Sequence, residues 1–281
     1  MPLQVMENPV LKRDLKIRFR LRNLIKAVFV RYACIGLIFI LALLSQIGNN
    51  ILSFIIAQAV TIMLFIPATI YDAFASKIGK RDMRELAFTR LNPMTVILGK
   101  VVSANIYNFI IIIFSFIFLL IISLSQKKVS VSGIIYSNIV TIAIMSAISA
   151  VSLFFCAIFR KNVIASTILP YFVILLLLFS VIISGPFIDR TESQQFKKIM
   201  INSALYASPA VNLARASGKI DIMRTLYLYT IADPIVGRGF SYPDWRISCT
   251  IYVGISILLL FIASLLIRLR KTDTEYEEMK K

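Results

Sequence analysis

ILSFIIAQAVTIMLFIPATIY, residues 51–71, contains no Lys, Arg, Asp or Glu and is the stretch that decides the fold. A helix of about 20 apolar residues crosses a hydrocarbon core of about 30 Å, so this stretch is long enough to span a membrane. Other uncharged stretches of similar length lie before and after it. Their apolar residues are continuous rather than alternating, which indicates helices and not barrel strands.

The sequence therefore predicts an all-α polytopic membrane protein with six transmembrane helices. The turn at Gly48-Asn49-Asn50 divides the first uncharged stretch into two spans. The expected spans are residues 27–46, 51–71, 101–124, 134–159, 163–183 (with a kink at Pro170) and 246–267. Residues 27–71 thus hold the first two spans and 101–183 hold the third to fifth.

The connecting segments are expected to differ in character. Residues 1–26 form a cytoplasmic, interfacial N-terminal helix, although a disordered basic arm is an alternative for them. Residues 72–100 form a cytoplasmic loop and 268–281 a cytoplasmic tail. Residues 184–245 form an extracytoplasmic segment, in which 193–206 and 221–231 are expected to be short amphipathic helices.

The distribution of basic residues predicts the orientation. The 281-residue chain has a formal net charge of +17 and is 58% hydrophobic. Most Lys and Arg lie before the first span, in residues 72–100, at Arg160-Lys161 and in the tail, all on one side of a six-span protein. Cytoplasmic loops collect Lys and Arg, so both termini are expected to be cytoplasmic. Membrane lipids rather than nucleic acid then account for the charge.

Missing residue types narrow the possible functions. The chain has no His, and its Gly79-Lys80 and Gly99-Lys100 pairs lack the other residues of a phosphate-binding Walker loop. The centres of the predicted spans carry no ionisable group, whereas ion-coupled carriers keep such groups at membrane depth. The amides within or near the spans are expected to bond between helices; they are Gln58, Asn105, Asn108 and Asn138. Any active transport must therefore take its energy from elsewhere.

Residues 78–94, IGKRDMRELAFTRLNPM, are the most structured part of the cytoplasmic loop. Met83, Leu86, Ala87 and Arg90 share one helical face, and Asn92-Pro93 is expected to end this helix. Taken alone, the stretch is a connecting loop with a solvated charged face.

The same segment resembles the signature of the permease subunits of type-2 ABC exporters. The matching residues are Thr89, Leu91, Asn92, Pro93, Gly99 and Lys100. Asn8-Pro9-Val10-Leu11 is similar to the N-terminal elbow helix of that family, residues 154–165 to its fourth-to-fifth hairpin, and residues 206–210 to its last external stretch. Two departures are that Asp82 is the only acidic residue at the start of the loop helix, and that Arg90 replaces the usual Pro.

The resemblance implies a non-catalytic permease subunit in a plasma membrane, such as the bacterial inner membrane. Its partners would be a second permease subunit, identical or related, and separate cytoplasmic ABC ATPase subunits that hold ATP and Mg. No cofactor or metal is expected in this chain.

The resemblance also implies roles for three groups of residues. The ATPase-coupling residues would be Arg84, Glu85, Arg90, Asn92, Pro93 and Lys100. The elbow helix would use Arg13, Lys16, Arg18 and Arg20, and the substrate path would include Gln58, Thr61 and Thr167.

Two other classes of function remain open from the residues alone. The chain is alternatively a membrane scaffold or sensor whose external segment binds a partner, without a transport path. A membrane-embedded enzyme is less favoured, because no nucleophile, metal set or acid–base pair stands out in the sequence.

Overall fold

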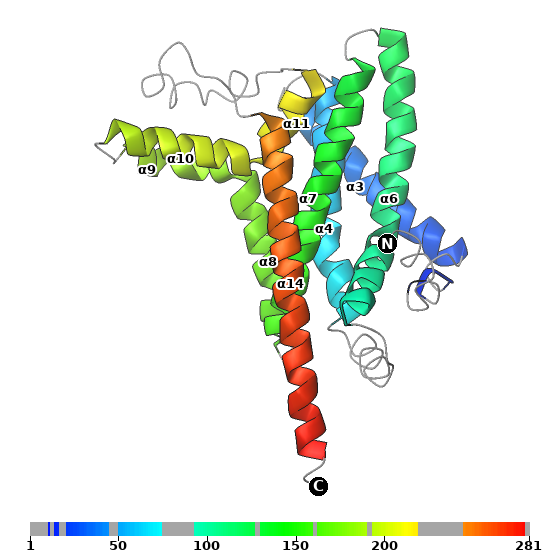
Figure 1. Cartoon of the computed structure of the whole chain (residues 1–281). Coiled ribbons are helices and arrows are strands. Elements are labelled where there is room, and N and C mark those ends of the chain that lie inside the picture. Colours follow the sequence, from blue (N-terminus) through cyan, green and yellow to red (C-terminus); the bar gives the residue numbers. More distant parts are fainter. Residues whose placement is uncertain are drawn as a thin grey trace.

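The computed structural model describes residues 11, 14–16, 21–44, 50–74, 93–126, 130–159, 162–189, 193–218 and 244–278. Within these ranges every regular element is a helix (Figure 1), which confirms the all-α prediction. The long helices are α3 (Leu21–Leu44), α4 (Asn50–Phe74), α6 (Pro93–Gln126), α7 (Val131–Ile158) and α14 (Trp245–Glu278). The shorter ones are α8 (Val163–Leu178), α9 (Ser180–Asp189), α10 (Gln194–Ala207) and α11 (Pro209–Gly218).

Five of the described helices are long and apolar enough to cross a membrane, namely α3, α4, α6, α7 and α14. The protein is therefore a helical membrane protein. The expected fifth span, residues 163–183, is not one uninterrupted helix: α8 continues through Pro170, ends at Leu178, and is followed after Phe179 by α9. At 1.5 Å per residue, the 16 residues of α8 measure about 24 Å, less than the hydrocarbon thickness of about 30 Å.

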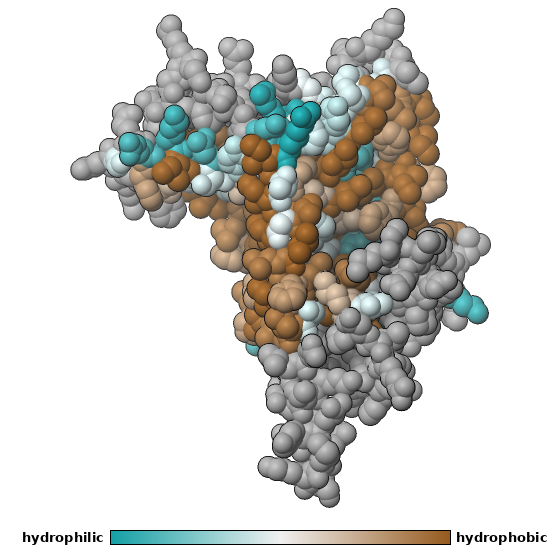
Figure 2. All heavy atoms as spheres, viewed as in Figure 1, coloured by the Kyte–Doolittle hydropathy of each residue, from teal (hydrophilic) through white to brown (hydrophobic). Residues whose placement is uncertain are grey.

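Helix α7 lies at the centre of the bundle and packs against α4, α6, α8, α11 and α14. The main core is built from apolar side chains of α4, α6 and α7, including Ile66, Ile97 and Ile148. In contrast, α3 and α14 expose about half of their apolar side chains, such as Phe29 and Phe261. Figure 2 shows apolar residues across the side of the bundle. Such a surface suits contact with lipid tails and not with water.

The helices of the bundle run in two opposite directions, and the bundle has two distinct ends. Lys100 near the start of α6 meets Ala73 at the end of α4, and this end is called the Lys100 end. Leu52 near the start of α4 packs with Ala214 of α11, which marks the α11 end. Helices α4, α7 and α14 run from the α11 end towards the Lys100 end, whereas α3, α6 and α8 run the other way (Figure 1).

Several predicted boundaries were wrong. Helix α6 begins at Pro93, eight residues before the expected start of the third span. Proline suits that position because the first helical residue needs no N–H partner. Helix α14 continues to Glu278, so the expected tail is mostly helical. Residues 77–92 and 221–231, where two further helices were expected, lie outside the described residues.

The external segment is only partly as expected. Helix α10 matches the predicted helix at 193–206, with Ser193 as its N-cap residue. Helices α9 and α11 were not predicted. Ser208 separates α10 from α11, and Pro209 is the first residue of α11. The stretch at residues 206–210, which the resemblance singled out, is therefore a corner between two helices.

Candidate functional site

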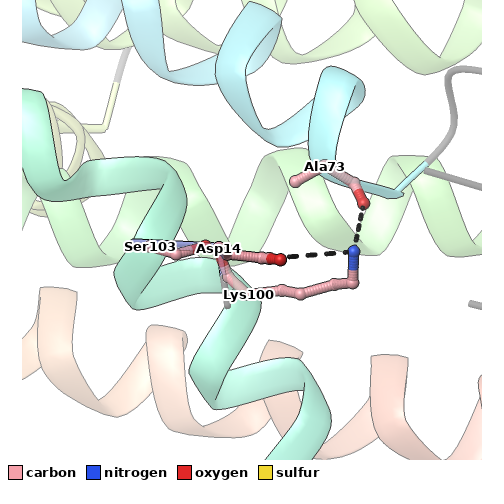
Figure 3. Close-up of polar contacts among 4 residues, drawn as sticks. All are labelled: Asp14, Ala73, Lys100 and Ser103. Carbon is pink, nitrogen blue, oxygen red and sulfur yellow. Dashed lines mark hydrogen bonds and ion pairs between the residues drawn. The ribbon is translucent and has the colours of Figure 1, made fainter. Parts of the chain in front are cut away.

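A buried lysine joins three segments at the Lys100 end of the bundle. The Lys100 side chain lies two turns into α6 and is 1% exposed. Its Nζ donates a hydrogen bond to the Ala73 carbonyl oxygen at 3.2 Å and lies 4.0 Å from Oδ2 of Asp14 (Figure 3). The last carbonyls of a helix have no partner within that helix and carry partial negative charge, so Ala73 near the end of α4 suits a cation.

Ser103, one turn after Lys100, completes this junction. Its Oγ lies 3.5 Å from Oδ2 of Asp14 and 2.9 Å from the carbonyl oxygen of Lys100, and its single proton can serve one of these acceptors at a time. Asp14 belongs to the short described part of the N-terminal segment, where residues 14–16 are helical. The Lys100 junction (Asp14, Ala73, Lys100 and Ser103) therefore ties the N-terminal segment to the end of α4 and the start of α6.

A second buried cation, Arg31, lies inside a candidate span. Arg31 is 4% exposed and lies within α3, in the span from Asn23 to Leu44. Its Nε donates to Oδ1 of Asn108 at 3.2 Å, and its Nη1 donates to the Ala27 carbonyl oxygen at 3.2 Å. The guanidinium carbon lies 4.6 Å from the ring centroid of Phe65 and 5.3 Å from that of Tyr107. These are cation–π distances, which compensate part of the cost of burying the charge.

The Arg31 contact continues as a chain of amides across α6 to α7. Asn108 Nδ2 donates to Oδ1 of Asn105 at 3.1 Å, and Asn105 Nδ2 donates to Oγ of Ser149 at 2.9 Å. Asn105, Asn108 and Ser149 are all buried. The Arg31 network (Arg31, Asn108, Asn105 and Ser149) thus connects α3, α6 and α7 through polar bonds within an apolar bundle.

The network corrects one expectation and supports another. Arg31 was counted with the charges that precede the first span, so the prediction that the spans contain no ionisable group near their centres does not hold for α3. Arg31 is eight residues from the start of this 22-residue span, or about 12 Å along the axis, and so lies near its middle. The expected interhelical role is confirmed for Asn105 and Asn108, whereas the bond recorded for Asn138 is to Ile134 of its own helix.

The two buried clusters share one helix. Lys100 and Asn108 are eight residues apart on α6, which places them about 12 Å apart along the axis and about 80° apart around it. Movement of α6 would therefore act on both clusters at once. Because an ionisable side chain at membrane depth is costly, each cluster is a candidate functional site.

The predicted substrate-path residues are not brought together by any recorded contact. Gln58 and Thr61 are buried one turn apart on α4, and Thr61 Oγ1 donates to the Ala57 carbonyl oxygen at 2.8 Å. Thr167 is half-buried on α8 and donates to Ile164 at 3.3 Å. Gln58 Nε2 has no hydrogen-bond partner among the described residues.

The predicted coupling and elbow residues fall mostly outside the described part of the chain. These are Arg84, Glu85, Arg90 and Asn92 in the loop, and Arg13, Arg18 and Arg20 in the N-terminal segment. Lys16 is described as helical and exposed. Pro93 begins α6, and Lys100 is buried, so the Lys100 side chain bonds within this chain and offers no surface to a partner.

A third polar cluster lies at the α11 end and was not predicted. Asn212 of α11 donates through Nδ2 to the carbonyl oxygens of Tyr206 and Ser208, both at 2.9 Å. Tyr252 of α14 donates to the Ala207 carbonyl oxygen at 2.9 Å and lies 3.4 Å from Asn212 Nδ2. These bonds hold the α10–α11 corner against α14. Tyr252 lies within an apolar run of α14, so nothing in the sequence indicated that it would hold this corner.

The described residues contain no group of three or more His, Cys, Asp and Glu side chains that could hold a metal ion. Chemically, the arrangement offers buried cations and amides that position helices. Comparisons of the chain with protein-family models, curated proteins and solved structures found no match.

Proposed function

We propose that the chain is the membrane permease subunit of an ATP-driven exporter and is coupled to separate cytoplasmic ATPase subunits. The observation that carries this proposal is the Lys100 junction. The two segments that the family resemblance assigns to ATPase contact are the N-terminal segment and the 72–100 loop. Lys100, near the start of α6, contacts Asp14 of the N-terminal segment and Ala73 near the end of α4. These two helix ends border residues 75–92, which lie outside the described residues.

The junction suggests how force would pass from an ATPase into the bundle. A push on residues 75–92 would reach the end of α4 at Phe74 and the start of α6 at Pro93. Helix α6 is continuous from Pro93 to Gln126, so it would move as one lever. The buried ion pair of Lys100 and Asp14 would make the N-terminal segment move with it.

The Arg31 network would then distribute the movement of α6. Asn108 holds Arg31 of α3, and Asn105 holds Ser149 of α7. Rocking of packed helices that keep a few polar links is a known way to change access from one side of a bundle to the other. In this proposal both termini and the Lys100 end face the cytoplasm, and the protein works as a homo- or heterodimer.

Co-purification tests the proposal. The full-length protein, tagged and solubilised in mild detergent, is expected to retain a soluble ATPase with a Walker loop, and the complex is expected to hydrolyse ATP. Charge reversal of Glu85 and Arg90 is expected to uncouple hydrolysis from transport without unfolding the chain. Reversal at Lys197 and Lys198 of α10 is the matched control, because α10 lies at the α11 end.

Two results would reject this function. One is uphill transport by the purified chain in vesicles without any ATPase. The other is absence of any ATPase from the purified assembly together with normal function of the Glu85 and Arg90 reversal. The second result would favour the scaffold or sensor alternative.

A further inference from the structure

Helices α9 and α10 form a lateral arm at the α11 end of the bundle. Ser180 Oγ at the start of α9 donates to the Ala204 carbonyl oxygen near the end of α10 at 3.0 Å. The two helices therefore run antiparallel, and they pack against each other. Figure 1 shows this α9–α10 arm projecting sideways, across the direction of α7 and α14.

The arm exposes apolar side chains next to polar ones. On α10, Ile201 and Leu205 are buried, whereas Phe196 and Ile199 are 52% and 60% exposed. At 100° per residue, Phe196 and Ile199 lie within 60° of each other, and Lys198 lies about 100° from Ile199. Phe179, Ile182 and Ile183 add exposed apolar surface at the bundle end of the arm.

The exposed apolar surface of the arm continues from that of α8. Along α8, at least half of the surface of three apolar side chains is exposed: 57% for Ile168, 56% for Phe172 and 50% for Leu175. In Figure 2 hydrophilic residues lie along the upper edge of the arm, and apolar residues lie below them towards the side of the bundle. The surface that faces lipid on α8 therefore turns onto the arm without a polar break in that view.

An aromatic pair marks the level of the membrane surface. Trp245, the first residue of α14, stacks on Tyr136 near the start of α7, with ring centroids 5.0 Å apart and planes at 27°. Trp and Tyr concentrate where hydrocarbon meets headgroups. Figure 1 shows the arm close to the level at which α14 begins, so the arm lies where the headgroup region is expected.

We propose that the α9–α10 arm lies flat in the headgroup region of the surrounding membrane. Phe196 and Ile199 insert among the upper parts of the acyl chains, and Lys198 faces lipid phosphates. Amphipathic helices with this arrangement bind in the plane of the interface. The argument does not depend on transport, so the arm would be a lipid anchor under the scaffold alternative as well.

Lipid is more suitable than a protein partner to cover the exposed apolar surface of the α9–α10 arm, for two reasons. The exposed apolar surface is continuous with the side of a membrane bundle, and it is bordered by a basic residue that anionic headgroups attract.

The chain has a single tryptophan, which makes a fluorescence test of the arm possible. Trp245→Phe provides a tryptophan-free background, and Phe196→Trp then reports the surroundings of the arm.

The experiment uses the full-length protein in vesicles of phosphatidylcholine and phosphatidylglycerol, with or without brominated acyl chains. Bromolipid is expected to remove much of the Phe196→Trp emission, while acrylamide in the water has little effect. Lys198→Trp, about 160° from Phe196 around α10, is the matched control and is expected to show the reverse. Ile199→Trp repeats the test at a second site, and circular dichroism confirms folding of each variant.

Two outcomes would overturn the proposal. If acrylamide quenches Phe196→Trp and Ile199→Trp as strongly as Lys198→Trp, and bromolipid does not, then the arm stands in water. If their emission lies at short wavelength and neither agent quenches it, then a second copy or another protein covers the arm.

Discussion

The two ends of the bundle are held together in different ways. At the Lys100 end, one long charged side chain reaches from α6 to α4 and to Asp14, across distances of 3.2 and 4.0 Å. At the α11 end, small residues bring backbones close, and the Asn212–Tyr252 cluster adds neutral hydrogen bonds. A flexible lysine can follow a moving partner, whereas close backbone packing resists movement. We therefore expect the Lys100 end to move more readily than the α11 end.

Gly133 shows how close the packing at the α11 end is. A Cβ at this position of α7 would overlap the carbonyl group of Ser217 in α11. Only glycine leaves room for that approach. Gly218 ends α11 directly afterwards with a φ of 148°, a value that side chains rarely allow.

The largest expected effect is the loss of the buried cation at the Lys100 end. Lys100→Met should destabilise the protein by about 3 kcal/mol, because one partner of a buried ion pair is removed. Thermal unfolding in detergent, followed by circular dichroism, measures the change. The double variant with Asp14→Asn should recover part of the loss. If the two single effects simply add, the recorded 4.0 Å contact contributes nothing.

Removal of the second cation should have a smaller effect. Arg31→Met is expected to cost about 2 kcal/mol, since a charged hydrogen bond and two aromatic contacts are lost while the burial of a charge is avoided. Arg31→Lys is the informative comparison, because it keeps the charge but loses the planar group. Equal stability of Arg31→Met and the parent protein would show that the network does not hold α3 to α6.

The close packing at the α11 end is tested by adding a methyl group at Gly133, where α7 approaches Ser217 of α11. Gly133→Ala should lower the free energy of unfolding by about 1 to 2 kcal/mol, because the added methyl group forces α7 and α11 apart. Gly254→Ala in α14 is the matched control, since a Cβ there meets nothing within 4 Å and alanine favours a helix. A loss of the same size in Gly254→Ala would mean that the close approach at Ser217 is not the cause.

The smallest expected effect comes from one hydroxyl group. Tyr252→Phe removes the bond to the Ala207 carbonyl oxygen and should cost about 1 kcal/mol. Under the proposed function it should leave coupling between ATP hydrolysis and transport unchanged, whereas Lys100→Met should weaken that coupling. Equal uncoupling by both variants would remove the distinction between a moving end and a fixed end.

The sequence was sufficient to locate the long helices because length and hydropathy alone determine which segments leave water. It failed where a residue had two plausible environments. Arg31 follows a basic segment and was counted with the N-terminal charges, yet Asn108, Phe65 and Tyr107 provide a buried place for its head group. Lys100 follows Gly99 at an apparent helix start, and only the helix from Pro93 brings it inside.

The shorter helices were harder to predict for a different reason. Helix α11 buries Leu213, Ala214 and Ala216, which are small or isolated apolar residues that produce a weak pattern. Its position depends on contacts with α4 and α7 that are distant in sequence. Helix α9 begins two residues after α8 ends, so hydropathy alone assigned its first four residues to the span of α8.

Helix α14 continues as a rod beyond its apolar part. Its 34 residues measure about 51 Å, of which the 22 residues from Trp245 to Leu266 account for about 33 Å. The remaining 18 Å or so form a stalk that extends past the ends of α4, α7 and α8 (Figure 1). A reporter domain joined at Glu278 would thus inherit the rotation of the stalk, and each inserted residue would swing that domain by about 100°.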